Sequence, residues 1–408
     1  MKKDQKPEIT PENVQEIVSA AQIMIPKTGL YEKLKSAEIE GKRLRVKMGF
    51  DPTSPDLHLG HAVAMRQLRK FQDLGHKPVV IIGDFTGLIG DPSGRNQSRP
   101  LASKKQLEKN AETYISQLSK ILDIDDVEIH KNSEWLSNMS LTEVIHLLAQ
   151  GTLGQTISRD DFRKRLDSGS PIALHEIIYP FLQGTDSLAI DADIELGGVD
   201  QLYAFQAART LQTNRGDEPE IAIMMPLLRG TDGAKKMSKS IGNYIGLNDE
   251  PRDMFGKVMS IPDYLIEEYL TLASGFSSEE TKQMIDDIKN GRNPMEIKIL
   301  LANNITETYH GAEAADDAFK YFEKQFRSKQ EEAIEFTPVV VNPSIRFVVD
   351  LLIELGVADS KNKSRRLIED GGVTINGQKI IPGQENLDNP IGLKVKVGPR
   401  RFFETKEK

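Results

Sequence analysis

Cysteine is absent from the 408 residues of this chain, and its absence excludes several kinds of chemistry. Without thiols there is no disulfide framework, no cysteine nucleophile and no cysteine-ligated zinc. The apolar run at residues 79–82 is far too short to cross a bilayer, and the opening Met-Lys-Lys-Asp-Gln-Lys lacks the apolar core of a signal peptide. We therefore expect a soluble, cytoplasmic protein with no membrane partner.

The chain has fewer basic than acidic residues: 53 Lys and Arg against 61 Asp and Glu, which gives a net charge of −8. This total argues against a nucleic-acid partner, but the charge is unevenly distributed. From residue 343 to the end, Lys and Arg outnumber Asp and Glu by 12 to 9. Local potential decides contact with a phosphate backbone, so the C-terminal segment is a candidate for binding RNA.

The length allows two or three domains. Residues 1–230 alternate strand-like and helical runs, as a parallel α/β domain does, and residues 231–250 hold a lysine-serine loop and a connection. Residues 251–333 lose the strand signal and keep helical periodicity. Residues 334–343 contain two prolines and predict a linker. Residues 344–408 then form a small module of their own.

Five strands are predicted in the α/β part. They are Leu44–Gly49, Pro78–Gly83, Val127–His130, Ala192–Glu195 and Ile221–Met225. Several of these strands run into turns rich in Gly or Asp. In an open parallel sheet such turns gather at the carboxyl ends of the strands, where ligands bind.

The C-terminal module has a pattern of two helices and a hairpin. Ile345–Leu355 is amphipathic, and Ser360 is placed to cap a second helix. Strands are predicted at Val373–Ile375 and Gln378–Ile380, joined by an Asn-Gly turn. Four basic residues cluster on the second helix: Lys361, Lys363, Arg365 and Arg366. This cluster either binds RNA or forms the solvated face of a docking domain.

Two motifs far apart in the chain carry the main functional signal. His58-Leu-Gly-His61 follows a strand-like run and opens a helix-period segment, Leu59–Leu74. Both imidazoles then lie at a helix N-terminus, where free N–H groups and the helix dipole favour anions. The later run Lys-Lys-Met-Ser-Lys-Ser, at residues 235–240, supplies ammonium groups of the kind that bind triphosphates. Either motif alone is weak, but the pair predicts a nucleotide activated at its α-phosphate.

Polar residues on one further predicted helix form a second cluster. Tyr179, Gln183 and Asp186 stand at i, i+4 and i+7, so they share a helix face. Pro180 predicts that this helix begins close to Tyr179. Apolar neighbours would pack the helix, so the polar face points at a partner. For Asp186, the alternative is a carboxylate on a helix surface.

The two motifs resemble the signatures of class I aminoacyl-tRNA synthetases, and four further stretches narrow the resemblance to the tyrosyl-tRNA synthetases of the second bacterial type. Those stretches are Gly49–Thr53, Thr86–Gly94, Tyr179–Asp186 and Gly197–Gln201. The resemblance covers nearly the whole chain. It implies an α/β fold: a Rossmann-like parallel-sheet catalytic domain, then an α-helical domain on the anticodon side and a small α+β RNA-binding module of the α-L type.

The same resemblance implies the reaction and its partners. L-Tyrosine would be activated by ATP to tyrosyl-adenylate and pyrophosphate, then transferred to the 3′ end of its tRNA. ATP, accompanied by Mg²⁺, is a substrate, and no tightly bound cofactor and no metal site on the protein are implied. A homodimer is also expected, with one tRNA reaching across both subunits.

Site residues carry over from the family position by position. Those implied for ATP, its phosphates and catalysis are Asp51, Thr53, His58, Gly60, His61, Arg95, Arg99, Asp200, Lys236 and Lys239. Those implied for tyrosine are Asp91, Tyr179, Gln183, Asp186 and Gln201. Within this second set Asp186 would bind the phenolic hydroxyl, while the ammonium would bind Asp91, Tyr179 and Gln183. One position departs from many relatives, because Lys47 stands where they have a tyrosine that also binds the hydroxyl.

Three other interpretations remain open from the sequence. A tryptophanyl-tRNA synthetase shares both signatures, but the Tyr-x-x-x-Gln-x-x-Asp helix and the basic C-terminal module favour tyrosine. A metabolite nucleotidylyltransferase with His-x-Gly-His would leave that module unexplained. A non-catalytic RNA-binding protein built on a retired synthetase is opposed by five intact residues: His58, His61, Asp186, Asp200 and Lys239.

Overall fold

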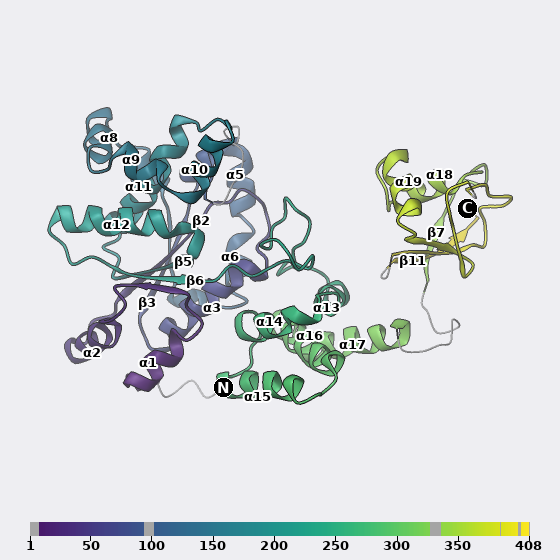
Figure 1. The fold of residues 1–408 in the computed structure, drawn as a ribbon, viewed down its shortest axis with the longest axis horizontal. Helices are drawn as coiled ribbons and strands as arrows, with labels where there is room; N and C mark the ends of the chain where they lie inside the picture. Colours follow the sequence, from purple (N-terminus) through teal and green to yellow (C-terminus); the bar gives the residue numbers. More distant parts are fainter. Residues whose placement is uncertain (1–7, 94–101, 327–335, 384, 399–400, 408) are drawn as a thin grey trace. The chain divides into compact units, whose positions relative to one another are not determined.

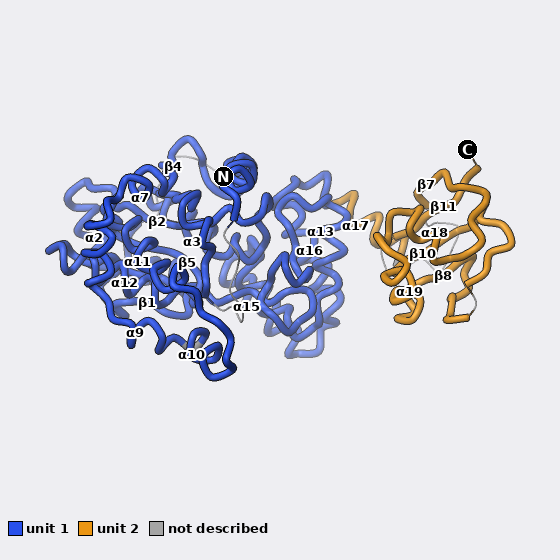
Figure 2. The backbone as a smooth tube through the Cα atoms, turned by 90° about the horizontal axis from the view of Figure 1, so that it is seen from above, with its two compact units in different colours: residues 1–315 blue, residues 316–408 orange. Residues whose placement is uncertain are grey.

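The computed structural model describes residues 8–93, 102–326, 336–383, 385–398 and 401–407. The chain divides into two compact units, residues 1–315 and residues 316–408 (Figure 2). A six-stranded sheet lies in the first unit and a five-stranded sheet in the second. None of the described helices is long and apolar enough to cross a membrane.

The sheet of the first unit has the strand order β1-β6-β5-β2-β3-β4. Its strands are β1 (Ile23–Ile25), β2 (Arg45–Phe50), β3 (Lys77–Ile82), β4 (Glu128–Lys131), β5 (Ile194–Gly198) and β6 (Ile221–Met225). β1 is antiparallel to β6, and the other neighbours are parallel. The five predicted strands correspond to β2–β6 with ends shifted by three residues or fewer. The sequence missed β1, whose three residues are too few to show a period.

The strand order reverses at β2, whose neighbours are β3 on one side and β5 on the other. The chain runs outward from β2 to β3 and β4, then returns to β5 on the opposite side of β2. A crevice for ligands therefore opens between the carboxyl ends of β2 and β5. Asp51 directly follows β2, and Asp200 lies in the 3₁₀ turn η2 (Val199–Gln201) after β5. The topology thus brings distant parts of the predicted site together.

Helices cover both faces of this sheet (Figure 1). α3 (Leu59–Asp73) packs along β2, β3 and β5 with Val63, Leu68 and Phe71 buried, as predicted. On the other face α11 (Leu174–Ala189) packs against α12 (Leu202–Arg215). The other helices of this part are α1 (Pro11–Ile17), α2 (Leu30–Glu40), α4 (Thr86–Ile89), α5 (Lys104–Ala111), α6 (Tyr114–Leu118), η1 (Ile124–Asp126), α7 (Ser133–Leu136), α8 (Leu141–Leu148), α9 (Leu153–Ile157) and α10 (Asp160–Asp167).

The prediction for the start of α11 was wrong. The helix begins at Leu174 rather than close to Tyr179, and Pro180 lies inside it. Proline favours the first turn because it lacks an N–H and clashes with the preceding turn. Here the burial of Phe181 and Leu182 against α12 outweighs that local preference. Because the helix continues through the proline, one rigid element carries the three polar residues of the predicted site.

After residue 250 the first unit continues as helices, as predicted. They are α13 (Pro251–Met259), η3 (Asp263–Leu265), α14 (Ile266–Leu272), α15 (Ser278–Lys289), α16 (Pro294–His310) and α17 (Ala312–Phe326). The boundary between the compact units falls inside α17, so residues 251–315 belong to the same unit as the six-stranded sheet. A separate helical domain at residues 251–333 stays a prediction.

The second unit has a mixed sheet in the order β7-β11-β10-β8-β9. Its elements are β7 (Thr337–Val340), α18 (Val348–Glu354), α19 (Lys361–Glu369), β8 (Val373–Ile375), β9 (Gln378–Lys379), β10 (Lys394–Val397) and β11 (Arg401–Lys406). The helices pack on the sheet through a core that includes Leu351, Leu352 and Ile368. Ser360 caps α19 by accepting a hydrogen bond from the N–H of Lys363.

One prediction for this unit needs correction, and two strands were not predicted. Residues 337–340, predicted as part of a linker, form β7, which pairs in parallel with β11. Pro338 is compatible with that pairing because β7 is an edge strand. The sheet also contains β10 and β11, which the sequence pattern did not reveal. The predicted hairpin is present, and Asn376 and Gly377 have the positive φ angles, 48° and 80°, that such a turn requires.

Candidate active site

The carboxyl end of β2 places Asp51 at the centre of the crevice. Its carboxylate accepts hydrogen bonds from Thr86 Oγ1 at 2.7 Å and from the Tyr179 hydroxyl at 2.9 Å. Burial raises the pKa of Asp51 to about 7, although both hydrogen bonds act in the opposite direction. A side chain at Gly83 would place its Cβ 2.1 Å from Asp51 Oδ1, so only glycine fits beside this carboxylate.

A cavity of about 190 Å³ opens beside Asp51. Eight of the residues predicted from the sequence line it: Asp51, Thr53, His61, Asp91, Tyr179, Gln183, Asp186 and Gln201. They come from the ends of β2 and β5, from α3, from α11 and from the segment after α4. Residues separated in sequence therefore converge on one space, which is of a size for a small molecule.

One wall of the cavity carries the carboxylate of Asp186, which is buried rather than on a helix surface. Trp135 Nε1 donates to Asp186 Oδ1 at 2.8 Å, and Asn132 Nδ2 donates to Oδ2 at 3.2 Å. Burial raises the pKa of Asp186 to about 7, while the charge of Lys47 and these two donors oppose the rise. Sequence reasoning missed Asn132 and Trp135. The only available signal was that Trp135 is the single tryptophan of the chain.

Asp91 lies in the same cavity, on the segment after α4. Its Oδ1 accepts the N–H of Ser93 at 2.8 Å. Burial and the negative charge of Asp200 raise the pKa of Asp91 above its ordinary value. Three carboxylates, two tyrosine hydroxyls and two glutamine amides thus line the cavity, and this excess of acceptors suits a ligand with a positive charge and a hydroxyl donor.

The two histidines meet at the start of α3, with ring centroids 3.8 Å apart. The backbone N–H of His58 donates to Nδ1 of His61 at 3.2 Å. Because that nitrogen accepts, the proton of a neutral His61 ring is on Nε2. Burial, followed by Lys239 and Lys236, lowers the pKa of His61 to about 4. Burial and the neighbouring His61 lower the pKa of His58 as well, so both rings are neutral at pH 7.

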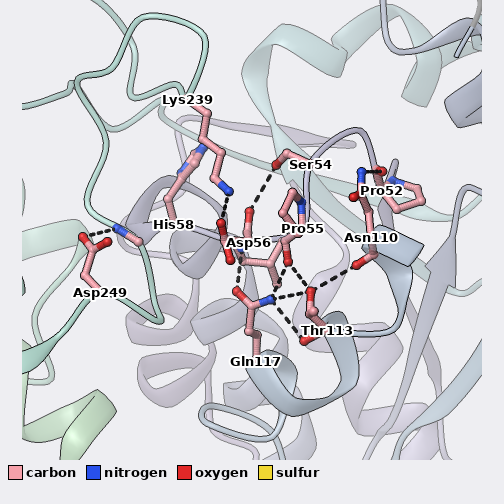
Figure 3. A network of polar contacts seen from close by, with 12 residues as sticks. Pro52, Ser54, Pro55, Asp56, His58, Asn110, Thr113, Gln117, Lys239 and Asp249 are labelled. Carbon is pink, nitrogen blue, oxygen red and sulfur yellow. Dashed lines mark hydrogen bonds and ion pairs between the residues drawn. The ribbon is translucent and has the colours of Figure 1, made fainter. Parts of the chain in front are cut away.

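Both lysines of the Lys-Met-Ser-Lys-Ser run reach this end of the site. Lys236 Nζ contacts Asp200 Oδ2 at 2.8 Å, and Lys239 forms an ion pair with Asp56 (Figure 3). Gly60 lies in the first turn of α3, where an added Cβ would be 3.0 Å from the His58 ring. The cationic groups therefore approach the helix start that the sequence predicted them to join.

A polar network holds the turn between β2 and α3 (Figure 3). Gln117 accepts the N–H of Leu57 at 2.6 Å and donates to the carbonyl of Pro55 at 3.0 Å. Asn110 donates to the carbonyl of Pro52 at 2.8 Å. These contacts fix the segment that carries Thr53 and Asp56, and sequence reasoning identified neither Asn110 nor Gln117.

Several predicted residues are not among the described residues that line the cavity. Arg95 and Arg99 lie outside the described residues. The four basic residues of α19 belong to the second unit and are exposed. Lys361 pairs with Asp350 and Lys363 with Asp359, whereas Arg365 and Arg366 have no ion-pair partner within the described part of the chain. No cluster of His, Asp or Glu within the described ranges could hold a metal ion.

Comparison with known proteins defines the class of this chain. A family model for class I tRNA synthetases (W and Y) matches residues 40–327, and one for the S4 domain matches residues 348–385. A tyrosine–tRNA ligase 2 from Photorhabdus laumondii is 47% identical over 96% of this chain and 98% of its own length. A tyrosine–tRNA ligase from Thermotoga maritima is 45% identical over 97% of this chain and 98% of its own length. The chain belongs to the class I tRNA synthetases and, within them, to the tyrosyl-tRNA synthetase family.

Solved structures show the same fold. A C-terminally truncated mitochondrial tyrosyl-tRNA synthetase from Aspergillus nidulans superposes with a TM-score of 0.62 at 21% identity, covering 77% of this chain and 93% of its own. The tyrosyl-tRNA synthetase from Archaeoglobus fulgidus was solved as a complex with L-tyrosine. It superposes with a TM-score of 0.59 at 23% identity, covering 76% of this chain and 100% of its own. The Rossmann-like arrangement predicted from the sequence is confirmed.

Proposed function

We propose that this chain is a tyrosine–tRNA ligase. In the first step a carboxylate oxygen of L-tyrosine attacks the α-phosphorus of ATP, and the bond to the β-phosphate bridge breaks to release pyrophosphate. In the second step the terminal ribose hydroxyl of tRNA attacks the carbonyl carbon of tyrosyl-adenylate, and AMP leaves. The identity of the relatives over almost the full length supports both steps.

The polarity of the cavity is the main observation that supports tyrosine as the substrate. Asp186 accepts the phenolic hydroxyl at one wall, held in place by Trp135 and Asn132. Asp91, Tyr179 and Gln183 accept the ammonium. A buried carboxylate that hydrogen-bonds a hydroxyl disfavours phenylalanine, because the acceptor position that faces the ligand would lose its water without gaining a donor.

ATP is placed between the start of α3 and the lysine loop. Thr53 and His58 meet the γ-phosphate, His61 and Gly60 lie beside the nucleotide, and Asp200 contacts the ribose. Lys236 and Lys239 leave their carboxylate partners and close over the departing pyrophosphate. Arg95 and Arg99 approach the same phosphates, and Mg²⁺ accompanies ATP as part of the substrate. Preorganised donors supply the catalysis, because charge builds on the phosphoryl oxygens in the transition state.

The second unit takes the tRNA through Lys361, Lys363, Arg365 and Arg366, and its match to the S4 domain supports that role. A homodimer is part of the proposal. Exposed apolar side chains on α8, α9 and the start of α11 support it: Leu141, Ile145, Leu148, Leu153 and Leu174. Leu141, Ile145 and Leu148 lie on one short helix, and apolar side chains that adjoin on a surface are typical of a protein contact. A cytoplasmic location is also part of the proposal, and the bacterial relatives support it.

Amino-acid-dependent exchange of pyrophosphate into ATP tests the first step. We expect exchange with tyrosine, and none above background with phenylalanine or tryptophan at the same concentration. Preference for tryptophan would favour the tryptophanyl alternative. Exchange that depends on an added metabolite instead of an amino acid would favour a nucleotidylyltransferase, and no exchange with either kind of acceptor would favour a non-catalytic RNA-binding protein.

A further inference from the structure

A buried ionic cluster lies directly behind the cavity, between the sheet and α11. Lys47 of β2 and Glu195 of β5 are paired residues of adjacent parallel strands, with 0% and 1% of their surface exposed. Lys47 Nζ lies 2.8 Å from Glu195 Oε1. Glu220, immediately before β6, is also fully buried beside Glu195. Such a cluster is costly to desolvate, so its retention calls for a role.

Lys47 binds the turn of α11 that carries the cavity residues. Its ammonium donates to the carbonyl of Gln183 at 3.0 Å and to Ser187 Oγ at 2.8 Å. Together with the ion pair to Glu195, these two contacts use all three N–H donors of the ammonium. The two α11 partners are four residues apart, so Lys47 clamps one helical turn, and Asp186 lies within that turn.

Glu195 determines which way the Gln183 carboxamide points. Gln183 Nε2 donates to Glu195 Oε1 at 3.1 Å. An ionised carboxylate only accepts, so the NH₂ group must face it. Gln183 Oε1 is buried and has no hydrogen-bond partner among the described residues, and Gln183 lines the cavity. The oxygen is therefore the amide atom left for a ligand.

The protonation of the cluster supports this orientation. Burial alone would raise the pKa of Glu195, but the charge of Lys47 and the surrounding donors outweigh it and lower that pKa. Burial and the neighbouring Glu195 raise the pKa of Glu220 well above its ordinary value. These directions favour an ionised Glu195 beside the Lys47 ammonium and a protonated Glu220.

We propose that Lys47 and Glu195 are a positioning pair that fixes the Gln183 carboxamide with its oxygen toward the cavity, as an acceptor for the ammonium of the bound amino acid. The inference rests on the proposed function, since it deepens the role of Gln183. Neither residue of the pair touches the substrate; both act through Gln183 and its helical turn. Lys47 on β2 therefore contributes to recognition of the ligand's ammonium without contacting the ligand.

Titration calorimetry with the full chain measures the Kd values of two phenols, tyramine and 4-ethylphenol. The two differ only in the ammonium group, which 4-ethylphenol lacks. The variant Lys47→Met/Glu195→Met removes the pair without leaving an unpaired buried charge. We expect the Kd of tyramine to rise about tenfold to a hundredfold, the range for a hydrogen bond to a charged group. The Kd of 4-ethylphenol should change by less than about twofold, because it makes no ammonium contact.

Two further variants separate positioning from a general loss of structure. Glu195→Gln can keep an oxygen at the Oε1 position, which accepts from both Lys47 and Gln183, so it should bind tyramine nearly as the parent does. Arg165→Met/Glu176→Met removes another buried pair, 2.6 Å apart, in which Glu176 lies near the beginning of α11. It should leave the ratio of the two Kd values unchanged. If the first double variant does not fold, Glu195→Met alone removes the acceptor of the Gln183 NH₂ group, leaves the buried Glu220 beside Lys47 to balance its charge, and should show the same selective loss.

Equal losses for both phenols, or an unchanged ratio in Lys47→Met/Glu195→Met, would overturn the positioning role. A parent protein that binds tyramine no better than 4-ethylphenol would overturn it too, because no ammonium contact would then exist. Failure of the proposed function looks different: the parent would show no tyrosine-dependent pyrophosphate exchange, whatever the variants bind.

Discussion

At the residue scale, the environment of each titratable group decides its part in the site. His58 and His61 begin a helix that favours anions, yet burial and the nearby lysines keep both rings uncharged at pH 7. We propose that both rings act as hydrogen-bond donors to the phosphates and that Lys236 and Lys239 supply the positive charge. In that proposal the flexible lysine side chains follow the departing pyrophosphate, which a ring at the start of a helix cannot do.

His61 should make the fold sensitive to acid. Its pKa is about 4 in the folded chain against about 6.5 when unfolded, so between these values the unfolded chain binds a proton that the folded chain does not. The free energy of unfolding then falls as pH drops, by at most about 1.4 kcal/mol per pH unit. We expect His61→Asn, whose oxygen can still accept from His58, to lose less stability between pH 7 and pH 5. Urea titrations at both pH values check this, and identical losses would contradict it.

Lys239 should matter for chemistry rather than for tyrosine binding. In Lys239→Ala we expect the kcat of pyrophosphate exchange to fall by about 10²–10³, the cost of one preorganised donor, with little change in the KM for tyrosine. Lys235→Ala, an exposed lysine in the same loop, is the matched control and should keep the parent rate. Equal rates in the two variants would remove Lys239 from the pyrophosphate site.

At the scale of elements, the sequence predicts periodic structure well and exceptions poorly. β2–β6, α3 and the Asn376-Gly377 hairpin follow from local pattern, because buried runs and positive-φ turns have residue preferences. The helical course through Pro180 and the pairing of β7 depend on partners elsewhere in the chain. No local pattern contains that information.

The same limit applies to the site. Motif residues such as Asp51 and Gln183 could be named from the sequence and line the cavity that the structure shows. Their supports could not, because Trp135 and Asn132 reach Asp186 across the fold, and the Lys47–Glu195 pair forms only when two strands adjoin. The roles of individual residues at the site stay predictions, which ligand binding and the kinetics of variants test.

The exposed apolar face of α8 should hold two copies together. Leu141 and Ile145 are 76% and 58% exposed, one helical turn apart. Two carboxylates there would have to be desolvated in an apolar contact, so Leu141→Glu/Ile145→Glu should give a monomer. Sedimentation velocity of parent and variant checks this. The exposed Ile39→Glu on α2 is a control that should leave the dimer intact, and a parent that sediments as a monomer would contradict the proposal.

At the scale of the whole molecule, activation and RNA binding are assigned to different compact units. The cavity lies in the first unit, while α19 lies in the second with Arg365 and Arg366, which have no ion-pair partner among the described residues. We expect Arg365→Ala/Arg366→Ala to leave pyrophosphate exchange unchanged and to raise the KM for tRNA. The salt dependence of tRNA binding should become shallower, because fewer counterions are released.

A control for this prediction removes the same charge elsewhere. Lys282→Ala/Lys289→Ala takes two exposed lysines from α15 in the first unit, and should weaken tRNA binding less. An unchanged salt slope in the α19 variant, or an equal effect of the α15 variant, would show that α19 has no special contact with the RNA backbone.

The orientation of bound tyrosine tests the central assignment most directly. A crystal structure of the chain with L-tyrosine should show the phenolic oxygen within hydrogen-bond distance of Asp186, at about 2.5–2.7 Å. The ammonium should lie between Asp91, Tyr179 and the oxygen of Gln183, which leaves the carboxylate facing the start of α3. A tyrosine bound in the reverse direction, or outside this cavity, would contradict the account.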